Sequence, residues 1–200
     1  GKTVIDKRPP VVVYYIGIYE SARPAMPFSL IPKLILPSLT DVTPELLAAR
    51  GVRFLMLDFD NTIVPYTTNE PTEAMAAWLR RMAASEIGLC VVSNSRKPRV
   101  VEFCGKYQIA CITHAKKPFS RGIRECLTRF SLEPARCALV GDQIYTDVLG
   151  ANCAGMTSIL VPAIQNHTIW LKLRHVAERS RQRKTARIGP ESPAEMERRS

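Results

Sequence analysis

The hydrophobic residues of the chain fall into short uninterrupted runs separated by segments of helical periodicity. The apolar runs predict buried strands at 53–59, 88–93, 109–113, 136–141 and 157–161. The intervening segments predict helices at 71–85, 98–107, 119–130 and 145–154. In the first of these helices, one packed face is formed by Met75, Trp78, Leu79 and Met82. Strands that are apolar on both faces and joined by helices predict a Rossmann-like α/β fold, a parallel sheet flanked by helices on both faces.

The segments that flank this region have a different composition. Residues 1–37 carry six prolines, which predict an irregular N-terminal segment. Thr43, Pro44 and Gly51 then fit the N-cap, first turn and end of a short helix. Beyond residue 168, apolar residues mix with many Lys and Arg, which predicts a basic helix and a disordered tail. We therefore expect three parts, at 1–37, 38–168 and 169–200.

The charge of the chain is unusually positive. It has 28 Lys and Arg against 18 Asp and Glu, a net charge of +10 and a pI near 9.6. This surplus favours phosphate-rich partners. The basic segment 170–187 could bind an anionic membrane, because Trp170 and its apolar neighbours lie among the Lys and Arg residues. The apolar stretch 28–37 would be a second membrane contact. A merely solvated helix face is the alternative for 170–187. Nucleic acid is the less favoured partner because no aromatic platform or RNA-binding module is recognisable.

The cysteines indicate a reducing environment. They show neither a C-x-x-C pair nor a zinc-ligand spacing, and Cys90, Cys111 and Cys137 lie inside apolar runs. Free thiols pack there as small hydrophobes. No apolar stretch approaches the roughly 20 residues of a membrane-spanning helix, and the prolines beside the apolar run 11–19 argue against a signal peptide. We expect the cytoplasm or the interior of an organelle, with a possible peripheral membrane contact.

Polar residues gather where the predicted strands end. Asp58 and Asp60 follow the first strand, Ser93 and Asn94 the second, and Asp142 the fourth. In a parallel sheet these ends share one edge, which is where ligands bind. Carboxylates so close repel one another unless a cation lies among them, and oxygen ligands of this type suit Mg²⁺ completed by a substrate phosphate. The sequence therefore predicts a magnesium site for phosphate chemistry.

The same residues can divide the work of phosphate transfer. We expect Asp58 to attack phosphorus and Asp60 to protonate the leaving oxygen and later deprotonate water. Ser93 and Lys117 would bind the charged phosphate oxygens, with Lys116 competing for the second role. Asp147, five residues after Asp142, would support the metal from its outer shell or simply cap a helix.

The segments LDFDNT, VVSNS, HAKKP and GDQIYTD resemble, in order and spacing, the four signature motifs of the haloacid dehalogenase (HAD) superfamily. Residues 39–161 are similar more narrowly to the YqeG-type branch of its subfamily IIIA, which is related to mitochondrial phosphatidylglycerophosphatases. The resemblance implies an aspartyl-phosphate on Asp58, with Asp60 as general acid/base. It implies that Thr62 supports the loop after the first strand. It also implies that the substrate phosphate is bound by Ser93, Asn94 and Lys117. The metal would be bound by Asp58, Asp142 and the backbone carbonyl of Asp60.

The spacing between the motifs leaves no room for the large cap domain that many relatives of this superfamily carry. We therefore expect an open site that can bind a phosphate group carried by a membrane surface or a macromolecule. The leading hypothesis is a Mg²⁺-dependent phosphomonoesterase, with phosphatidylglycerophosphate as the substrate that the resemblance implies. Two alternatives stay open: a phosphatase of a soluble metabolite, nucleotide or protein, and a non-catalytic protein that binds phosphate or RNA.

Overall fold

The computed structural model describes residues 28–119 and 121–165. The chain divides into two units, Gly1–Asn166 and His167–Ser200, and all the described residues belong to the first. The predicted basic helix and tail lie outside the described residues, as does most of the predicted N-terminal segment.

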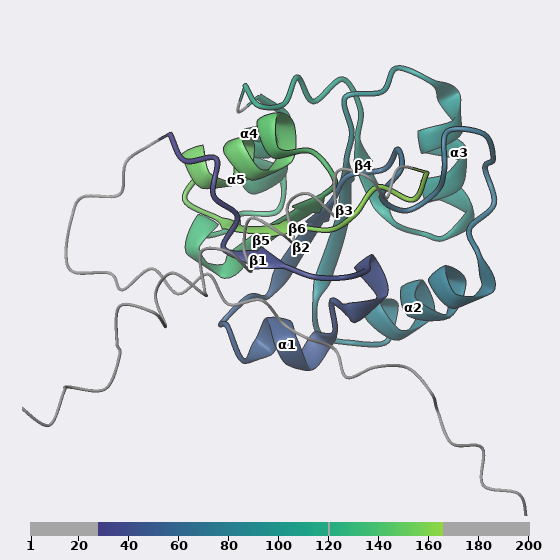
Figure 1. The fold of residues 1–200 in the computed structure, drawn as a ribbon, viewed down its shortest axis with the longest axis horizontal. Coiled ribbons are helices and arrows are strands. Elements are labelled where there is room, and N and C mark those ends of the chain that lie inside the picture. The colour runs from purple at the N-terminus through teal and green to yellow at the C-terminus, as the bar shows by residue number, and fades with distance from the viewer. Residues whose placement is uncertain (1–27, 120, 166–200) are drawn as a thin grey trace, which may run out of the picture. The chain divides into compact units, whose positions relative to one another are not determined.

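A six-stranded sheet organises the described residues, and every pair of neighbouring strands is parallel. The strands are β1 (Leu34–Ile35), β2 (Phe54–Leu57), β3 (Gly88–Val92), β4 (Ala110–Ile112), β5 (Cys137–Gly141) and β6 (Thr157–Leu160). Their order across the sheet is β1-β6-β5-β2-β3-β4 (Figure 1). The predicted strands are therefore present, each shorter than its apolar run by one to three residues.

Helices cover both faces of the sheet, as the pattern predicts. They are α1 (Pro44–Ala48), α2 (Glu73–Ala83), α3 (Pro98–Lys106), α4 (Arg121–Arg129) and α5 (Leu149–Cys153). Alternate residues of β2 serve the two faces: Leu55 and Leu57 belong to the core cluster under α1, α2 and α3, whereas Phe54 and Met56 belong to the cluster under α4 and α5. This alternation follows from the two-residue repeat of a strand. Figure 1 shows α4 and α5 on the side of the sheet opposite α1 and α2.

The strand order reverses direction beside β2. From β2 the chain moves outward through β3 to β4, and then returns to place β5 on the other side of β2. Ligands of open α/β sheets bind beyond the carboxyl ends of the strands at such a reversal. The loops after β2 and β5 are therefore adjacent, and they carry the predicted aspartates.

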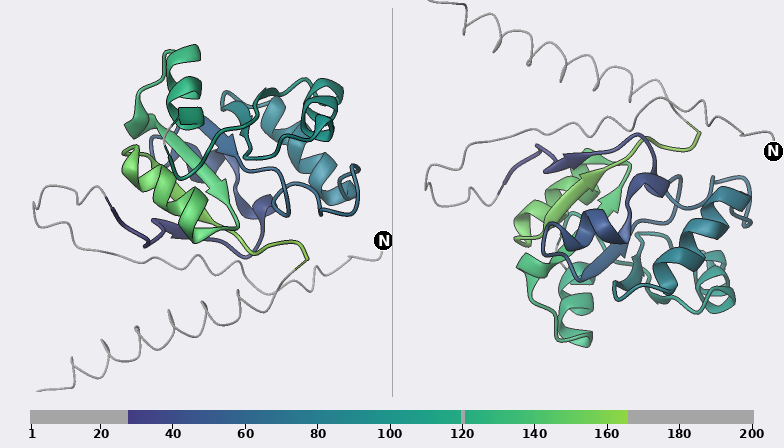
Figure 2. Two further views of the ribbon diagram at one scale, coloured as in Figure 1. Left: turned by 90° about the horizontal axis from the view of Figure 1, so that it is seen from above. Right: turned by 90° about the horizontal axis from the view of Figure 1, so that it is seen from below.

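The N-terminal prediction was wrong for residues 34–35. Leu34 and Ile35 pair with Ile159 and Leu160 of β6, and the N–H of Leu36 donates to the carbonyl of Leu160 at 3.0 Å. Figure 2 (right) shows the purple β1 beside the green strands. Pro32 and Pro37 are compatible with this pairing because they lie outside the paired residues and β1 is at the edge of the sheet.

The same finding corrects the predicted membrane contact of residues 28–37. Leu34, Ile35 and Leu36 are buried in the protein core, so only Phe28, Leu30 and Ile31 remain exposed as large apolar side chains. No helix in the described part of the chain combines the length and hydrophobicity needed to cross a bilayer. The cysteines are all free, and Cys90, Cys104, Cys126 and Cys137 are buried.

The last predicted helix is not uniform. Ile144–Val148 forms a π-helical turn before α5 begins at Leu149, and the N–H of Val148 donates to the carbonyl of Gln143 at 3.3 Å. Such wide turns occur mostly at functional sites. Here the turn brings the carboxylate of Asp147 inward, where it is 1% exposed.

Gly122 of α4 is tightly packed, and Gly105 of α3 is not. A Cβ at Gly122 would lie 2.4 Å from the Cβ of Ala115 and 2.5 Å from its Cα, whereas a Cβ at Gly105 of α3 would meet nothing within 4 Å. We expect Gly122→Ala to lower the free energy of unfolding by about 1–3 kcal/mol through overpacking. Gly105→Ala should raise it by up to about 1 kcal/mol through helix propensity. Chemical denaturation measures both, and equal effects would contradict the tight contact.

Candidate active site

Asp58 lies directly beyond β2, at the reversal point of the sheet. Its backbone N–H still donates to the carbonyl of Val140 at 2.9 Å, which continues the ladder between β2 and β5. The carboxylate is 7% exposed. Its Oδ1 lies 2.7 Å from Nζ of Lys117, and its Oδ2 lies 3.5 Å from the hydroxyl of Thr62. The predicted nucleophile is thus held rigidly at the edge of the sheet.

Lys117 is buried between two carboxylates. Its Nζ donates to Oδ1 of Asp58 at 2.7 Å and to Oδ1 of Asp147 at 2.6 Å. Burial alone would lower the pKa of Lys117, but the charges of Asp147 and Asp58 outweigh it, so the pKa is raised and the ammonium stays charged. The neighbouring Lys116 is exposed. The structure therefore brings Lys117, rather than Lys116, to the predicted nucleophile.

Three carboxylates converge on one point. One oxygen from each of Asp58, Asp142 and Asp147 lies within 4.8 Å of the others. Gly141 makes this possible, since a Cβ there would lie 2.2 Å from Oδ2 of Asp147. Burial raises the pKa of Asp142 to about 7, and the charges of Asp58 and Asp147 add to the shift. Burial likewise raises the pKa of Asp147 to about 6, against the opposing charge of Lys117.

This cluster fits a divalent cation. Partly buried carboxylates whose oxygens crowd together repel one another, and a hard cation with oxygen ligands relieves that repulsion. Asp58 and Asp142 were predicted to hold the metal, and Asp147 to lie outside them. Asp147 instead contributes an oxygen to the cluster itself. The side chain of Asp60 does not belong to the cluster, so its predicted part in the metal site rests on its backbone carbonyl.

Asp60 faces a different cation. Its Oδ1 lies 3.4 Å from Nη2 of Arg99, a residue of α3, and the two side chains are 16% and 10% exposed. Burial raises the pKa of Asp60, and the charge of Arg99 opposes that shift. A carboxyl group whose pKa is raised is suited to give up a proton as well as to accept one. Arg99 was not predicted as a site residue, because its separation along the chain from Asp60 carries no signal of the contact.

Ser93 and Asn94 end β3 beside Asp58, but the structure uses them differently. Ser93 is 1% exposed, and its hydroxyl oxygen accepts a hydrogen bond from the N–H of Ser95 at 3.0 Å, which leaves the hydroxyl proton free to donate. Both ends of the Asn94 amide bind the backbone of Lys117: Oδ1 accepts from its N–H at 2.7 Å and Nδ2 donates to its carbonyl at 3.1 Å. Asn94 thus positions Lys117, while the second hydrogen of its Nδ2 is left to donate, so its role as a phosphate ligand stays a prediction.

Thr62 lies between two of the aspartates. Its hydroxyl is 3.5 Å from Oδ2 of Asp58 and 3.4 Å from Oδ1 of Asp142, so its one proton can be donated to either. The residue is 2% exposed. This position agrees with the predicted supporting role in the loop after β2.

Three exposed aromatic side chains lie close in sequence to the site residues. Tyr66 follows Asp60, Phe119 follows Lys117, and Tyr145 lies between Asp142 and Asp147; they are 49%, 77% and 71% exposed. Burial raises the pKa of Tyr66, and the charges of Asp60, Asp142 and Asp58 add to that shift. We call these three residues the aromatic rim.

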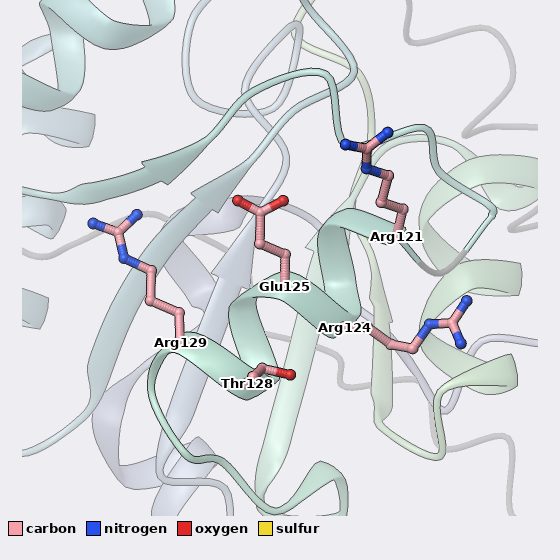
Figure 3. Close-up of a pocket in the computed structure, with 5 residues that line it drawn as sticks. All are labelled: Arg121, Arg124, Glu125, Thr128 and Arg129. Atoms are coloured by element: carbon pink, nitrogen blue, oxygen red, sulfur yellow. The ribbon is translucent and has the colours of Figure 1, made fainter.

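A separate surface hollow is lined by Arg121, Arg124, Glu125, Thr128 and Arg129 of α4. Its guanidinium groups point in different directions (Figure 3), so they do not converge on one anion. It contains none of the predicted site residues.

The chain is similar to several known proteins. The HAD-hydrolase-like family model matches residues 114–167. A Bacillus subtilis protein named "Probable phosphatase YqeG" is 32% identical over 131 residues, which cover 66% of this chain and 76% of that protein. Human Bargin is 32% identical over 96 residues, 48% of this chain and 12% of that protein. A cobalt-bound deoxy-D-mannose-octulosonate 8-phosphate phosphatase of Haemophilus influenzae aligns with a TM-score of 0.48 at 14% identity, over 62% of this chain and 75% of that chain.

A parallel α/β sheet with a carboxylate cluster at its reversal point is compatible with a HAD-type hydrolase. The identity to the Bacillus protein over three quarters of that protein's length shows the family. The chain belongs to the HAD superfamily, in its YqeG-type phosphatase branch. The family assignment drawn from the four motifs is thereby confirmed, and so is the predicted enzyme class of phosphatase. These comparisons do not show the link to mitochondrial phosphatidylglycerophosphatases.

Lys117 should be essential for the stability of the metal-free protein, and Lys116 should be dispensable for it. Lys117→Met leaves two buried carboxylates without their counter-ion, so we expect it to lower the free energy of unfolding of the metal-free protein by about 3–5 kcal/mol. Lys116→Met changes an exposed residue and should stay within about 0.5 kcal/mol of wild type. Denaturation in EDTA measures both. If the two variants behave alike, Lys117 is not the counter-ion of the cluster.

Mg²⁺ should stabilise the protein through the carboxylate cluster. At 100 times its dissociation constant, a ligand of the folded state raises the free energy of unfolding by about 2.7 kcal/mol. Asp142→Asn should remove most of this gain, since it replaces a charged ligand of the cluster. Thermal unfolding across a Mg²⁺ titration measures it, and undiminished stabilisation of Asp142→Asn would contradict the proposed ligand.

The metal-free protein should lose stability as the pH rises toward 7. The pKa of Asp142 is about 7 in the folded protein against an ordinary 3.8, so the folded state binds this proton more tightly than the unfolded state does. Its contribution is complete below the ordinary pKa and lost as the pH rises through about 7. Asp142→Asn should flatten this part of the pH dependence, measured by thermal unfolding in EDTA.

Proposed function

We propose that the protein is a Mg²⁺-dependent phosphomonoesterase that works through an aspartyl-phosphate on Asp58. The observation that carries the proposal is the pairing of two carboxylates from one loop with different surroundings. Asp58 is bound by Lys117 at 2.7 Å within the acidic cluster, whereas Asp60 stands apart from that cluster, 3.4 Å from Arg99. The two can therefore take different chemical roles.

Asp58 and Asp60 together can carry out all the bond changes and proton transfers of the reaction. An oxygen of Asp58 attacks phosphorus, the bond from phosphorus to the ester oxygen breaks, and Asp60 gives its proton to the departing oxygen. Asp60 then takes a proton from water, which attacks the phosphorus of the aspartyl-phosphate. Inorganic phosphate leaves, and the carboxylate of Asp58 and the protonated Asp60 are restored. A non-catalytic binding protein would need neither of these two carboxylates in these positions.

The remaining groups stabilise charge. Lys117 and the hydroxyl of Ser93 would bind the phosphate oxygens as negative charge develops on them. Asp58, Asp142 and Asp147 would hold the metal, together with the backbone carbonyl of Asp60. When bound, Mg²⁺ would offset the charge of the carboxylates and of the phosphate. Asn94 keeps Lys117 in place through its backbone.

The substrate is a phosphate group carried by a membrane surface or a macromolecule, and specifically the phosphate of an anionic membrane lipid. Within the described residues, the connections between the strands hold short helices and loops but no further folded domain that could enclose a small substrate. The aromatic rim and the exposed cations Arg96 and Lys97, in the connection between β3 and α3, suit an interface rich in phosphate and lipid. Phosphatidylglycerophosphate is the lipid that the motif resemblance favours. A soluble phosphate ester is the second candidate.

Substitution of the nucleophile tests the mechanism. Asp58→Asn should abolish phosphate release from every ester, because an amide cannot form the aspartyl-phosphate. Asp60→Asn should lower kcat by about 10²–10⁴-fold, the usual contribution of a general acid/base. Phosphate release with and without Mg²⁺ measures both, and appreciable turnover by Asp58→Asn would overturn the mechanism.

A second assay separates the two substrate classes. Turnover of phosphatidylglycerophosphate in anionic vesicles is compared with turnover of para-nitrophenyl phosphate in solution. For a lipid substrate, Phe119→Ser should lower the vesicle activity and leave the solution activity unchanged, because Phe119 is 77% exposed. An enzyme that hydrolyses soluble esters but not the lipid would exclude the membrane substrate while retaining the phosphatase.

A further inference from the structure

The two catalytic carboxylates are paired with two cations from separate elements. Lys117, in the loop after β4, contacts Asp58, and Arg99, near the start of α3, contacts Asp60. Asp58 and Asp60 are only two residues apart, yet each has its own counter-ion. The proposed reaction requires this separation, because one carboxylate must reach phosphorus while the other reaches the leaving oxygen.

Arg99 is fixed to the loop that carries Asp60. Its Nη1 donates to the carbonyl of Tyr66 at 2.8 Å and its Nη2 to the carbonyl of Pro65 at 3.0 Å. Its guanidinium carbon also lies 5.1 Å from the centre of the Phe59 ring, a cation–π contact. The planar, rigid guanidinium can make these contacts together, which a lysine ammonium cannot. Arg99 therefore holds the loop on both sides of Asp60.

The contact with Asp60 itself is looser. Oδ1 of Asp60 lies 3.4 Å from Nη2 of Arg99 and makes no hydrogen bond within the described residues. Oδ1 is buried, so Oδ2 is the oxygen that remains to exchange a proton. The two backbone carbonyls each accept one hydrogen bond from Arg99, and its Nε makes no hydrogen bond within the described residues. A phosphate-binding role of Arg99 is therefore distinguished from a positioning role by the effect of its substitution on KM.

We propose that Arg99 is a positioning residue, which holds the carboxyl group of Asp60 toward the leaving oxygen by locking the 59–66 loop around it. This inference rests on the proposed function, in which Asp60 exchanges the proton. It predicts that the first step, release of the leaving group, is slowed only for esters whose leaving oxygen needs a proton.

The dependence on the leaving group tests the proposal. In the first turnover, before the aspartyl-phosphate is hydrolysed, Arg99→Gln should slow release of glycerol from β-glycerophosphate, a poor leaving group, by about 10–100-fold, the cost of misplacing a catalytic group. It should slow release of para-nitrophenol from para-nitrophenyl phosphate by less than about threefold, since that leaving group needs little protonation. Asp60→Asn should show the same selectivity more strongly. Arg99→Lys should remain defective, because it cannot span the two carbonyls and Asp60.

Lys106→Gln is the matched control. Lys106 also belongs to α3 and forms a 2.8 Å ion pair with Glu70 in the connection between β2 and α2, but both side chains are exposed and neither contacts Asp60. This variant should keep wild-type kcat on both esters.

The outcomes can be told apart. An equal loss on both esters, or a raised KM with unchanged kcat, would overturn the proposal, since the first indicates a structural role and the second substrate binding. A wild-type enzyme with no turnover of either ester would instead refute the proposed function. Undiminished Mg²⁺ stabilisation of Arg99→Gln would show that the variant is folded.

Discussion

The buried ammonium of Lys117 is the interaction on which the site depends. Two carboxylates from different loops, Asp58 after β2 and Asp147 after β5, bind it at 2.7 and 2.6 Å. Without it, the acidic cluster would place several like charges in a region from which water is largely excluded. Lys117 thus connects three loops at the carboxyl edge of the sheet, and Asn94 connects a fourth through its bonds to the Lys117 backbone.

Close packing lets this arrangement form. Gly141 leaves the space that the Asp147 carboxylate occupies, and Gly122 lets α4 approach Ala115, two residues before Lys117. The π-helical turn at Ile144–Val148 then directs Asp147 inward. Small residues and an irregular helix at these positions therefore bring the charged groups together, where a regular helix with larger residues would hold them apart.

Much of the fold and part of the site could be predicted from the chain alone. Buried strands and amphipathic helices repeat with different periods, so their order and the parallel sheet followed from the pattern. Asp58, Ser93 and Asp142 were placed correctly at strand ends because parallel strands end at one edge. Leu34 and Ile35 were missed because their pairing is with β6, more than 120 residues away, and the nearby prolines concealed it.

The sequence by itself determined the class of fold, the edge of the sheet that carries the chemistry, and the motif residues that belong to it. These properties are local, since they depend on the period of burial and on which residues end each strand. Only the tertiary structure decided how the charges are paired, Lys117 with Asp58 and Asp147 and Arg99 with Asp60, and that Asn94 binds the backbone of Lys117. Such contacts depend on distances between elements far apart in the chain, which no periodic pattern encodes.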